Sequence, residues 1–583
     1  MPSSLIDADS VLAVDVGSCT TRATLFDVVE SSYRFIAIGQ SPTSAAAPFK
    51  DVGEGVVQAI ENLQEITGRT FLNKDRCLII PSQEGVGIDS FVATISAGPA
   101  VKTVIVGLLN DVSLQSVQRL AHSTYASVME SIGVNDRRKP EELIDGILRL
   151  EPDLILIAGG TNGGATRSVQ KIIDIIGLAC YLMPAEKRPS VLFAGNQDVA
   201  KDVNASLTPM TSSMHISSNI RPSLDVEDIQ PASRELADVY LQIRRNHLGG
   251  VEELYSWSEG NLLPTAYAQG RLIRFMSQAY KSNKNILGVD IGASATTIAA
   301  GFNGELTLGV YPQFGLGEGL SGLLRHTSLD DIMRWLPLDI PTNNVRDYLY
   351  QKSTYPESMP ATLEDMAIEQ AITRQVLRLA IGATIKDIPV TVRRPFAGGL
   401  PYFEPILVGG SAITNAPTMG QGLLMLLDSI QPVGITTFIL DQNHLLPGLG
   451  AAAANNPILP VQIIESGAFM GLASVVVPVS NARVGSTILH GRLVTRDENE
   501  TRFEIKQGTL DVLPLPSGQT GHLFLEPLHG VDAGFGPGRS GDVQFSGTQL
   551  GVVIDARGRP LQLPSENGRR RELLKKWIWT LGG

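Results

Sequence analysis

Residues 11–24 read VLAVDVGSCTTRAT, and this stretch decides the fold. Its apolar start is long enough for one buried strand, Asp15 places a carboxylate where that strand ends, and Gly17 allows a tight reversal of the chain. The turn then carries three side-chain hydroxyls, those of Ser18, Thr20 and Thr21. The pattern predicts a β-hairpin whose turn can present backbone N–H groups to an anion.

A second copy of this pattern lies at 286–300, with the sequence ILGVDIGASATTIAA. Asp290 and Gly292 repeat the aspartate and the glycine of the first hairpin, and Thr296 and Thr297 repeat its threonine pair with one residue inserted. Two hairpins of this kind, one in each half of a duplicated chain, can hold the phosphates of a single nucleotide from both sides.

Each hairpin is followed, after a long span, by an apolar strand that runs into paired glycines. The first such strand is LILIAGG at 154–160, and the second is PILVGG at 405–410, followed by Ser411. The recurring order of hairpin, span and double-glycine strand predicts two related halves. We expect Gly409 and Gly410 to let the backbone approach a nucleoside, and the glycines of the first strand to serve packing.

Composition and net charge limit the kinds of molecule that we expect the protein to bind. The chain has 583 residues and a net charge of −12, from 47 Lys plus Arg against 59 Asp plus Glu, which disfavours nucleic acid or an anionic membrane as the main partner. Three widely spaced cysteines, Cys19, Cys77 and Cys180, form no metal or disulfide pattern. No signal-peptide pattern and no apolar run of about 20 residues is present, so we expect a cytoplasmic protein without an integral membrane span.

The order of elements predicts an α/β protein with an added β region. Apolar strands alternate with amphipathic helices before about residue 460, and short β-rich segments between glycine and proline turns follow. The basic tail RRRELLKKWIW at 569–579 is predicted to dock on the protein's own body. We expect a first half over 1–285, a second half over 286–460 and a mainly β domain over 461–583.

Four strings together, VDVGSCTTRAT, PDLILIAGGTNGG, VLFAGN and VDIGASATT, resemble the glutamate mutase L (MutL) family, whose symbol is shared with an unrelated mismatch-repair protein. The resemblance covers about residues 10–455. It implies a duplicated actin-like (ribonuclease H-like) ATPase fold, as in sugar kinases, Hsp70 and actin. It also implies ATP and Mg²⁺ as cofactors, and a role as an ATP-dependent chaperone or reactivating factor for a cobalamin-dependent mutase.

Particular residues are candidates for roles at a nucleotide site. Asp15 and Asp290 would hold Mg²⁺ and take part in catalysis, and Glu318, in the glycine-dense stretch 315–322, would orient the attacking water. Each aspartate can instead cap a turn, Glu318 can be a solvated loop residue, and the hydroxyls can bond across their hairpins. The residues expected to bind the nucleotide are Gly17, Ser18, Thr20, Thr21, Gly292, Thr296, Thr297, Gly409, Gly410 and Ser411.

The second hairpin departs from the family's usual Asp-Ile-Gly-Gly-Ala-Thr-Thr-Asp. Ala293 replaces the second glycine and Ile298 stands in place of the final aspartate, while Arg22 stands where many members have lysine after the first hairpin. Losing a carboxylate near Mg²⁺ weakens hydrolysis more than binding, because phosphoryl transfer depends on positioning and charge neutralisation. We expect a slow Mg²⁺-dependent ATPase, and the alternative is a nucleotide-gated scaffold with little or no hydrolysis.

Overall fold

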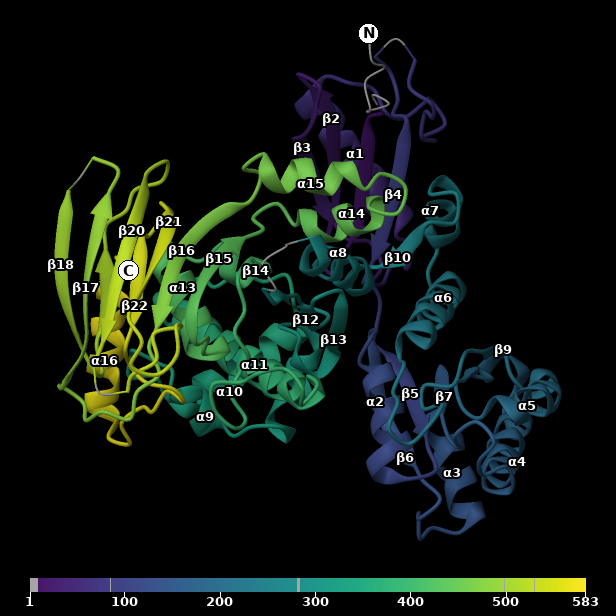
Figure 1. Ribbon diagram of the computed structural model, residues 1–583. Helices are drawn as coiled ribbons and strands as arrows, with labels where there is room; N and C mark the ends of the chain where they lie inside the picture. The colour runs from purple at the N-terminus through teal and green to yellow at the C-terminus, as the bar shows by residue number, and fades with distance from the viewer. Residues whose placement is uncertain (1–8, 84, 280–283, 498, 529) are drawn as a thin grey trace. The chain divides into compact units, whose positions relative to one another are not determined.

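The computed structural model describes residues 9–83, 85–279, 284–497, 499–528 and 530–583 (Figure 1). The chain forms two compact units, one made of Met1–Ala268 with Gly309–Pro312 and the other of Gln269–Leu308 with Gln313–Gly583. Each unit contains one of the two predicted hairpins. The domain limits predicted at 285 and 460 stay predictions.

The first hairpin forms the centre of a five-stranded sheet with the order β10-β4-β1-β2-β3. Strand β1 pairs with β2 in antiparallel and with β4 in parallel, and β10 pairs with β4 in parallel. Every residue of β1 is buried, as its apolar run predicts. The strands are β1 (Val11–Val16), β2 (Thr20–Val29), β3 (Ser32–Pro42), β4 (Ser90–Ile95) and β10 (Leu262–Pro264), and helix α1 (Gly53–Thr67) packs against β2 and β3.

The second hairpin repeats this arrangement in the other unit. The strand order β15-β14-β11-β12-β13 matches β10-β4-β1-β2-β3, and β11 again pairs with one antiparallel and one parallel neighbour. The strands are β11 (Ile286–Ile291), β12 (Thr296–Phe302), β13 (Glu305–Tyr311), β14 (Ile406–Gly409) and β15 (Gly434–Leu440). The matching order and directions confirm the predicted duplicated α/β fold.

The C-terminal region is rich in sheet, as predicted. Strands β16 (Met470–Val477), β22 (Val552–Asp555) and β19 (Leu510–Leu513) extend the second sheet beyond β15 to eight strands. A separate four-stranded antiparallel sheet contains β17 (Thr487–Thr495), β18 (Glu500–Lys506), β20 (Thr520–Pro527) and β21 (Gly541–Ser546). The tail forms α16 (Asn567–Thr580), which buries Leu574 and Trp577 within its own unit, so the predicted internal docking is confirmed.

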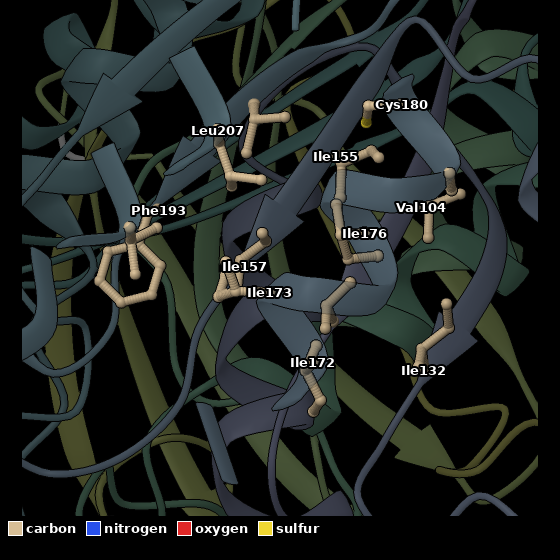
Figure 2. Close-up of a cluster of buried hydrophobic side chains, with 14 of the residues drawn as sticks. Val104, Ile132, Ile155, Ile157, Ile172, Ile173, Ile176, Cys180, Phe193 and Leu207 are labelled. Atoms are coloured by element: carbon tan, nitrogen blue, oxygen red, sulfur yellow. The ribbon is translucent and has the colours of Figure 1, made fainter. Parts of the chain in front are cut away.

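Residues 101–216, here called the inserted domain, separate β4 from β10 in the first unit. They form a sheet with the order β6-β5-β7-β8-β9 in which every neighbouring pair is parallel. Figure 2 shows part of its core, where Ile172, Ile173 and Ile176 of α4 lie near Ile155 and Ile157 of β7. The elements are β5 (Val101–Val106), α2 (Gln115–Ala121), β6 (Ala126–Ile132), α3 (Pro140–Leu150), β7 (Leu154–Ile157), α4 (Arg167–Leu182), β8 (Ser190–Phe193), α5 (Ala200–Leu207) and β9 (Ser213–Ile216).

The inserted domain corrects one prediction about the repeat. The double-glycine strand at 154–160 contains β7, which lies in the sheet of the inserted domain and not beside the first hairpin. The strand that corresponds to β14 is β4, because each is the parallel neighbour of its hairpin strand. The predicted equivalence of 154–160 and 405–410 is therefore wrong. An apolar run ending in glycines marks a strand that feeds a loop, and it does not identify that strand's neighbour.

Further helices connect these sheets, and among the described residues none is long and apolar enough to cross a membrane. Helix α11 begins at a capping box that Thr362 and Asp365 form. These helices are α6 (Gln230–His247), α7 (Val251–Trp257), α8 (Thr265–Ala279), α9 (Leu329–Met333), α10 (Thr342–Thr354), α11 (Leu363–Asp387), α12 (Ser411–Thr414), α13 (Met419–Ile430), α14 (Leu445–Ala452) and α15 (Ile458–Glu465).

Candidate functional site

The turn of the first hairpin is tight and requires glycine. The Gly17 N–H donates to the Thr20 carbonyl oxygen at 3.1 Å, and a Cβ at position 17 would lie only 2.7 Å from the same oxygen. Asp15 is paired with Arg22 across the two strands, and Val16 with Thr21. The turn therefore follows directly after the carboxylate, as predicted.

Thr43, which follows β3, holds this turn from the side. Its N–H donates to the Cys19 carbonyl oxygen at 2.9 Å, and its hydroxyl donates to the Gly17 carbonyl oxygen at 2.8 Å. The fully buried Thr21 shares a hydrogen bond of 2.8 Å with the Thr43 hydroxyl. The alternative interpretation, a hydroxyl that bonds within the protein, therefore holds for Thr21. Ser18 and Thr20 are half-buried on the turn itself.

Two threonines orient the Asp15 carboxylate, and the sequence interpretation missed both. Asp15 is 5% exposed, and its Oδ1 accepts hydrogen bonds from the hydroxyls of Thr94 at 2.6 Å and Thr265 at 2.8 Å. Thr94 lies in the parallel neighbour β4, and Thr265 follows β10. The available signal was a hydroxyl within an otherwise apolar strand at 90–95. Two donors on one oxygen fix the direction of the other.

The second hairpin has the same geometry, which corrects a second prediction. The Gly292 N–H donates to the Ala295 carbonyl oxygen at 3.0 Å, and Asp290 is paired with Thr297, as Asp15 is with Arg22. No residue is inserted, because Thr296 matches Thr21 and Thr297 matches Arg22. Counted in this register, the final aspartate of the family pattern falls on Thr297 and not on Ile298.

A glycine-dense loop supports the second turn in the way that Thr43 supports the first. The Leu316 N–H donates to the Gly292 carbonyl oxygen at 3.0 Å, and the buried Thr296 hydroxyl donates to the Phe314 carbonyl oxygen at 2.6 Å. A Cβ at Gly317 would lie 2.8 Å from the Ala293 oxygen, so the loop requires glycine there. Glu318 follows this close contact and is exposed. The structure thus brings the Glu318 loop against the second hairpin.

The paired glycines at the end of β14 let this strand approach Asp290 and Ile291 closely. Gly409 is paired with Asp290, and a Cβ at position 409 would lie 2.9 Å from Asp290 Oδ1. Gly410 has a φ of 103°, and a Cβ there would lie 2.4 Å from the Ile291 carbonyl oxygen. Ser411 is exposed and begins α12. These close contacts account for glycine at positions 409 and 410. The expected approach of a nucleoside to the two glycines stays a prediction.

Asp441 and His444 complete the polar surroundings of Asp290, and the sequence interpretation assigned neither to the site. His444 Nδ1 lies 3.8 Å from Asp290 Oδ1. Asp441 is buried after β15, and its two oxygens accept from the N–H groups of Leu445 at 2.8 Å and Leu446 at 2.9 Å, at the start of α14. Burial raises the pKa of Asp441 above its usual value, and the Asp290 carboxylate adds to this, while His444 and the two N–H groups oppose it.

The side chains near the two hairpins suit a metal ion that is held mainly by the phosphate oxygens of a bound molecule. Among the described residues, no group of three or more His, Cys, Asp or Glu side chains could hold a metal ion. Mg²⁺ at nucleotide sites is usually bound through one or two carboxylates, phosphate oxygens and water. Each of the two carboxylates, Asp15 and Asp290, therefore fits Mg²⁺ only where phosphate oxygens and water supply the remaining ligands.

Comparisons with known proteins identify a family for this chain and find solved structures that resemble it at low sequence identity. A model of the family described as MutL protein matches residues 11–467. No curated protein matches the chain. A nucleotide-free acetone carboxylase structure is 11% identical, with 86% of this chain and 81% of that chain covered and a TM-score of 0.31.

Two further solved structures resemble the chain with similarly low sequence identity and TM-score. Component A of (R)-2-hydroxyglutaryl-CoA dehydratase from Acidaminococcus fermentans is 8% identical, with 77% of this chain and 97% of that chain covered and a TM-score of 0.24. Ethanolamine utilization protein EutJ from Carboxydothermus hydrogenoformans is 11% identical, with 77% and 90% covered and a TM-score of 0.28. Because the family model spans most of the chain and the two sheets repeat each other, the chain belongs to the MutL protein family and has a duplicated actin-like fold.

Proposed function

We propose that this protein binds Mg-ATP through both hairpins and acts as a slow ATPase whose turnover depends on a protein partner. The observation that carries the proposal is the repeated hairpin geometry. Asp15 and Asp290 occupy the same place in two sheets of matching strand order, each directly before a tight glycine turn. Such turns present backbone N–H groups to phosphate, and a carboxylate beside them suits the accompanying Mg²⁺.

The proposed roles follow the sequence expectations and the contacts described above. Asp15 and Asp290 hold Mg²⁺, which neutralises charge on the β- and γ-phosphates, while Ser18 and Thr20 contact phosphate at the first turn. The turn of Gly409 and Gly410 with Ser411 lies beside the nucleoside. Glu318 orients water. The hydroxyls of Thr21 and Thr296 hold their turns in shape, because each is already bonded within the protein.

We expect slow ATP hydrolysis because of Thr297, which is paired with Asp290 across the hairpin. Thr297 stands at the position where the family usually has aspartate. A neutral hydroxyl supplies neither the charge nor the proton acceptor that would help to orient an attacking water. The ATP-bound state then persists until a partner completes or releases the site. ATP drives a change of shape only if it binds one state more tightly than the other. On family resemblance, the first partner to test is a cobalamin-dependent mutase.

Calorimetric titration with Mg-ATP and Mg-ADP tests the binding. We expect one site per chain in the wild type and a loss of Mg²⁺-dependent affinity in both Asp15→Ala and Asp290→Ala. Asp145→Ala is the matched control, because Asp145 is an exposed aspartate on α3. A wild type that gives neither heat nor a thermal shift at millimolar nucleotide would remove the basis for a nucleotide function.

Steady-state hydrolysis, measured with and without the candidate mutase, tests the switch. We expect slow turnover that the partner accelerates and that Asp15→Ala and Asp290→Ala abolish. Fast turnover without a partner contradicts the slow-switch model. Thr297 gives specific support to a second candidate, a nucleotide-gated scaffold, and tight ATP binding without hydrolysis under any condition would favour it.

A further inference from the structure

A short series of contacts connects the Asp15 carboxylate to the inserted domain. Thr265, whose hydroxyl donates to Asp15, is the first residue of α8. The N–H of the next residue, Ala266, donates to the Tyr125 hydroxyl at 3.1 Å. The first N–H groups of a helix have no acceptor within the helix, so the Tyr125 oxygen serves as a cap for this turn.

Tyr125 belongs to the inserted domain and lies where the chain enters it. It is 4% exposed, lies between α2 and β6, and its carbonyl oxygen accepts from the N–H of Val101, the first residue of β5. Its ring lies 5.7 Å from the ring of Tyr240 on α6, the helix that follows the inserted domain. Tyr125 therefore contacts the segments that enter and leave this domain.

Arg244, one turn after Tyr240 on α6, ties the same two segments together. Its guanidinium lies over the Tyr240 ring at 4.7 Å and donates to the Pro99 carbonyl oxygen at 2.6 Å, in the connection from β4 to β5. Position 98 favours glycine because its φ is 94°, and a Cβ there would also lie 2.9 Å from Arg244 Nη1. The junction is buried, with Arg244 and Tyr240 each 1% exposed. A shift of the inserted domain at this junction must therefore displace or break the bond from Ala266 to Tyr125.

We propose that Tyr125 is a positioning residue for Asp15, through which the inserted domain sets the affinity of the site for the Mg²⁺ complex of a nucleotide. The inference rests on the proposed function. By holding Ala266, Tyr125 fixes the first turn of α8 and so the Thr265 hydroxyl that orients Asp15. Binding couplings are reciprocal, so a partner that moves Tyr125 changes nucleotide affinity by the factor by which nucleotide changes the affinity for that partner.

A matched pair of tyrosine variants tests the assignment. Tyr125→Phe removes the acceptor of the Ala266 N–H and keeps the ring contact. Tyr240→Phe removes a buried hydroxyl from the same ring pair, and this hydroxyl has no hydrogen-bond partner in the described part of the chain. We expect the Kd for Mg-ADP to rise about threefold to tenfold in Tyr125→Phe, as for the loss of one buried hydrogen bond, and to stay unchanged in Tyr240→Phe. The Kd for ADP in EDTA should change in neither variant, because Asp15 acts through the metal.

Variants of Thr265 test whether the two residues act in series. Thr265→Val should weaken Mg-ADP binding, Thr265→Ser should restore it, and Tyr125→Phe combined with Thr265→Val should weaken it no more than the larger single effect. Multiplicative effects in the double variant, or an equal loss of affinity with and without Mg²⁺, would overturn the inference. A wild type that binds no nucleotide removes the proposed function and this inference together. A wild type that binds, with Tyr125→Phe unchanged, removes only the inference.

Discussion

Asp555 is a fully buried carboxylate held by two guanidiniums, with Arg557 Nε at 2.8 Å and Arg559 Nη2 at 2.7 Å. Arg557 also contacts the buried Asp428 at 2.7 Å. Removing one member of such a network leaves buried charge without compensation, so Arg557→Met should lower the free energy of unfolding by about 3–5 kcal/mol in urea denaturation. Arg502→Met is the control, because the exposed Arg502 pairs with Glu500 at the surface, and it should leave the urea midpoint unchanged. Equal midpoints for all three proteins would show that the buried network adds no stability.

The same carboxylate predicts a pH dependence. Burial alone would raise the pKa of Asp555, but the guanidiniums of Arg557 and Arg559 hold it well below its usual value. Its stabilising contribution is therefore complete above the unfolded pKa of about 4 and is lost as the pH falls toward the lower folded pKa. The free energy of unfolding should fall more steeply for the wild type than for Asp555→Asn below about pH 4. Parallel curves in urea titrations at several pH values would contradict this assignment.

Single residues also show how far the sequence could predict the site. Asp15 and Asp290 were identifiable because each ends an apolar run before a glycine, which is a local signal. Thr94 and Thr265 were not, because parallel pairing brings them to Asp15 from strands far along the chain. His444 reaches Asp290 in the same indirect way, from the segment after β15. Local patterns thus located the carboxylates, and only the assembled sheets located the groups that orient them.

At the scale of elements, the two hairpin turns differ in the space around their glycines, Gly17 in the first turn and Gly292 in the second. A Cβ at Gly17 would lie 2.7 Å from a backbone oxygen, and one at Gly292 would lie 3.2 Å from the equivalent oxygen. Gly17→Ala should therefore lower the free energy of unfolding by about 1–3 kcal/mol, since backbone must move to relieve the contact. Gly292→Ala serves as the matched variant and should cost less in the same urea denaturation experiment. The reverse order would contradict the geometry of the two turns.

Helix α16 offers a comparison within one element. Trp577 is 5% exposed and its ring lies 4.6 Å from the Arg557 guanidinium, whereas Trp579 is 81% exposed. Trp577→Ala should lower the free energy of unfolding by about 3–5 kcal/mol, and Trp579→Ala should leave it nearly unchanged. Thermal and urea denaturation of both variants measure this difference. Equal effects would mean that the tail does not dock through its Trp577 face.

The error over the double-glycine strand shows the limit of prediction for elements. The pattern at 154–160 correctly indicated a buried strand that ends in a glycine-rich loop. Its assignment to the first half of the repeat failed because the chain between β4 and β10 builds a sheet of its own. Local periodicity indicates that a segment forms a strand, but which strands become its neighbours depends on pairing between distant segments. The supposed insertion in the second hairpin failed similarly, since only the strand register aligns Thr297 with Arg22.

At the scale of the whole molecule, two compact units predict separable unfolding. Differential scanning calorimetry without nucleotide should show two transitions, because each unit has its own sheets and core. If both hairpins bind one Mg-ATP, saturating nucleotide should raise both transition temperatures, since a ligand stabilises whatever must unfold to release it. Asp15→Ala and Asp290→Ala should each reduce both shifts. A shift confined to one transition would assign nucleotide binding to one unit alone.

The buried junction of Pro99, Tyr125 and Arg244 has a consequence for protein engineering. An inserted domain whose entering and leaving segments are tied together can be exchanged for another domain with closely spaced ends, because the surrounding sheet keeps its own strand pairing. A circularly permuted fluorescent protein grafted between β4 and α6 would stand where Tyr125 now contacts α8. Because the exchange removes Tyr125 and its bond to Ala266, the chimera would show how tightly the site that contains Asp15 binds Mg-ADP without the inserted domain.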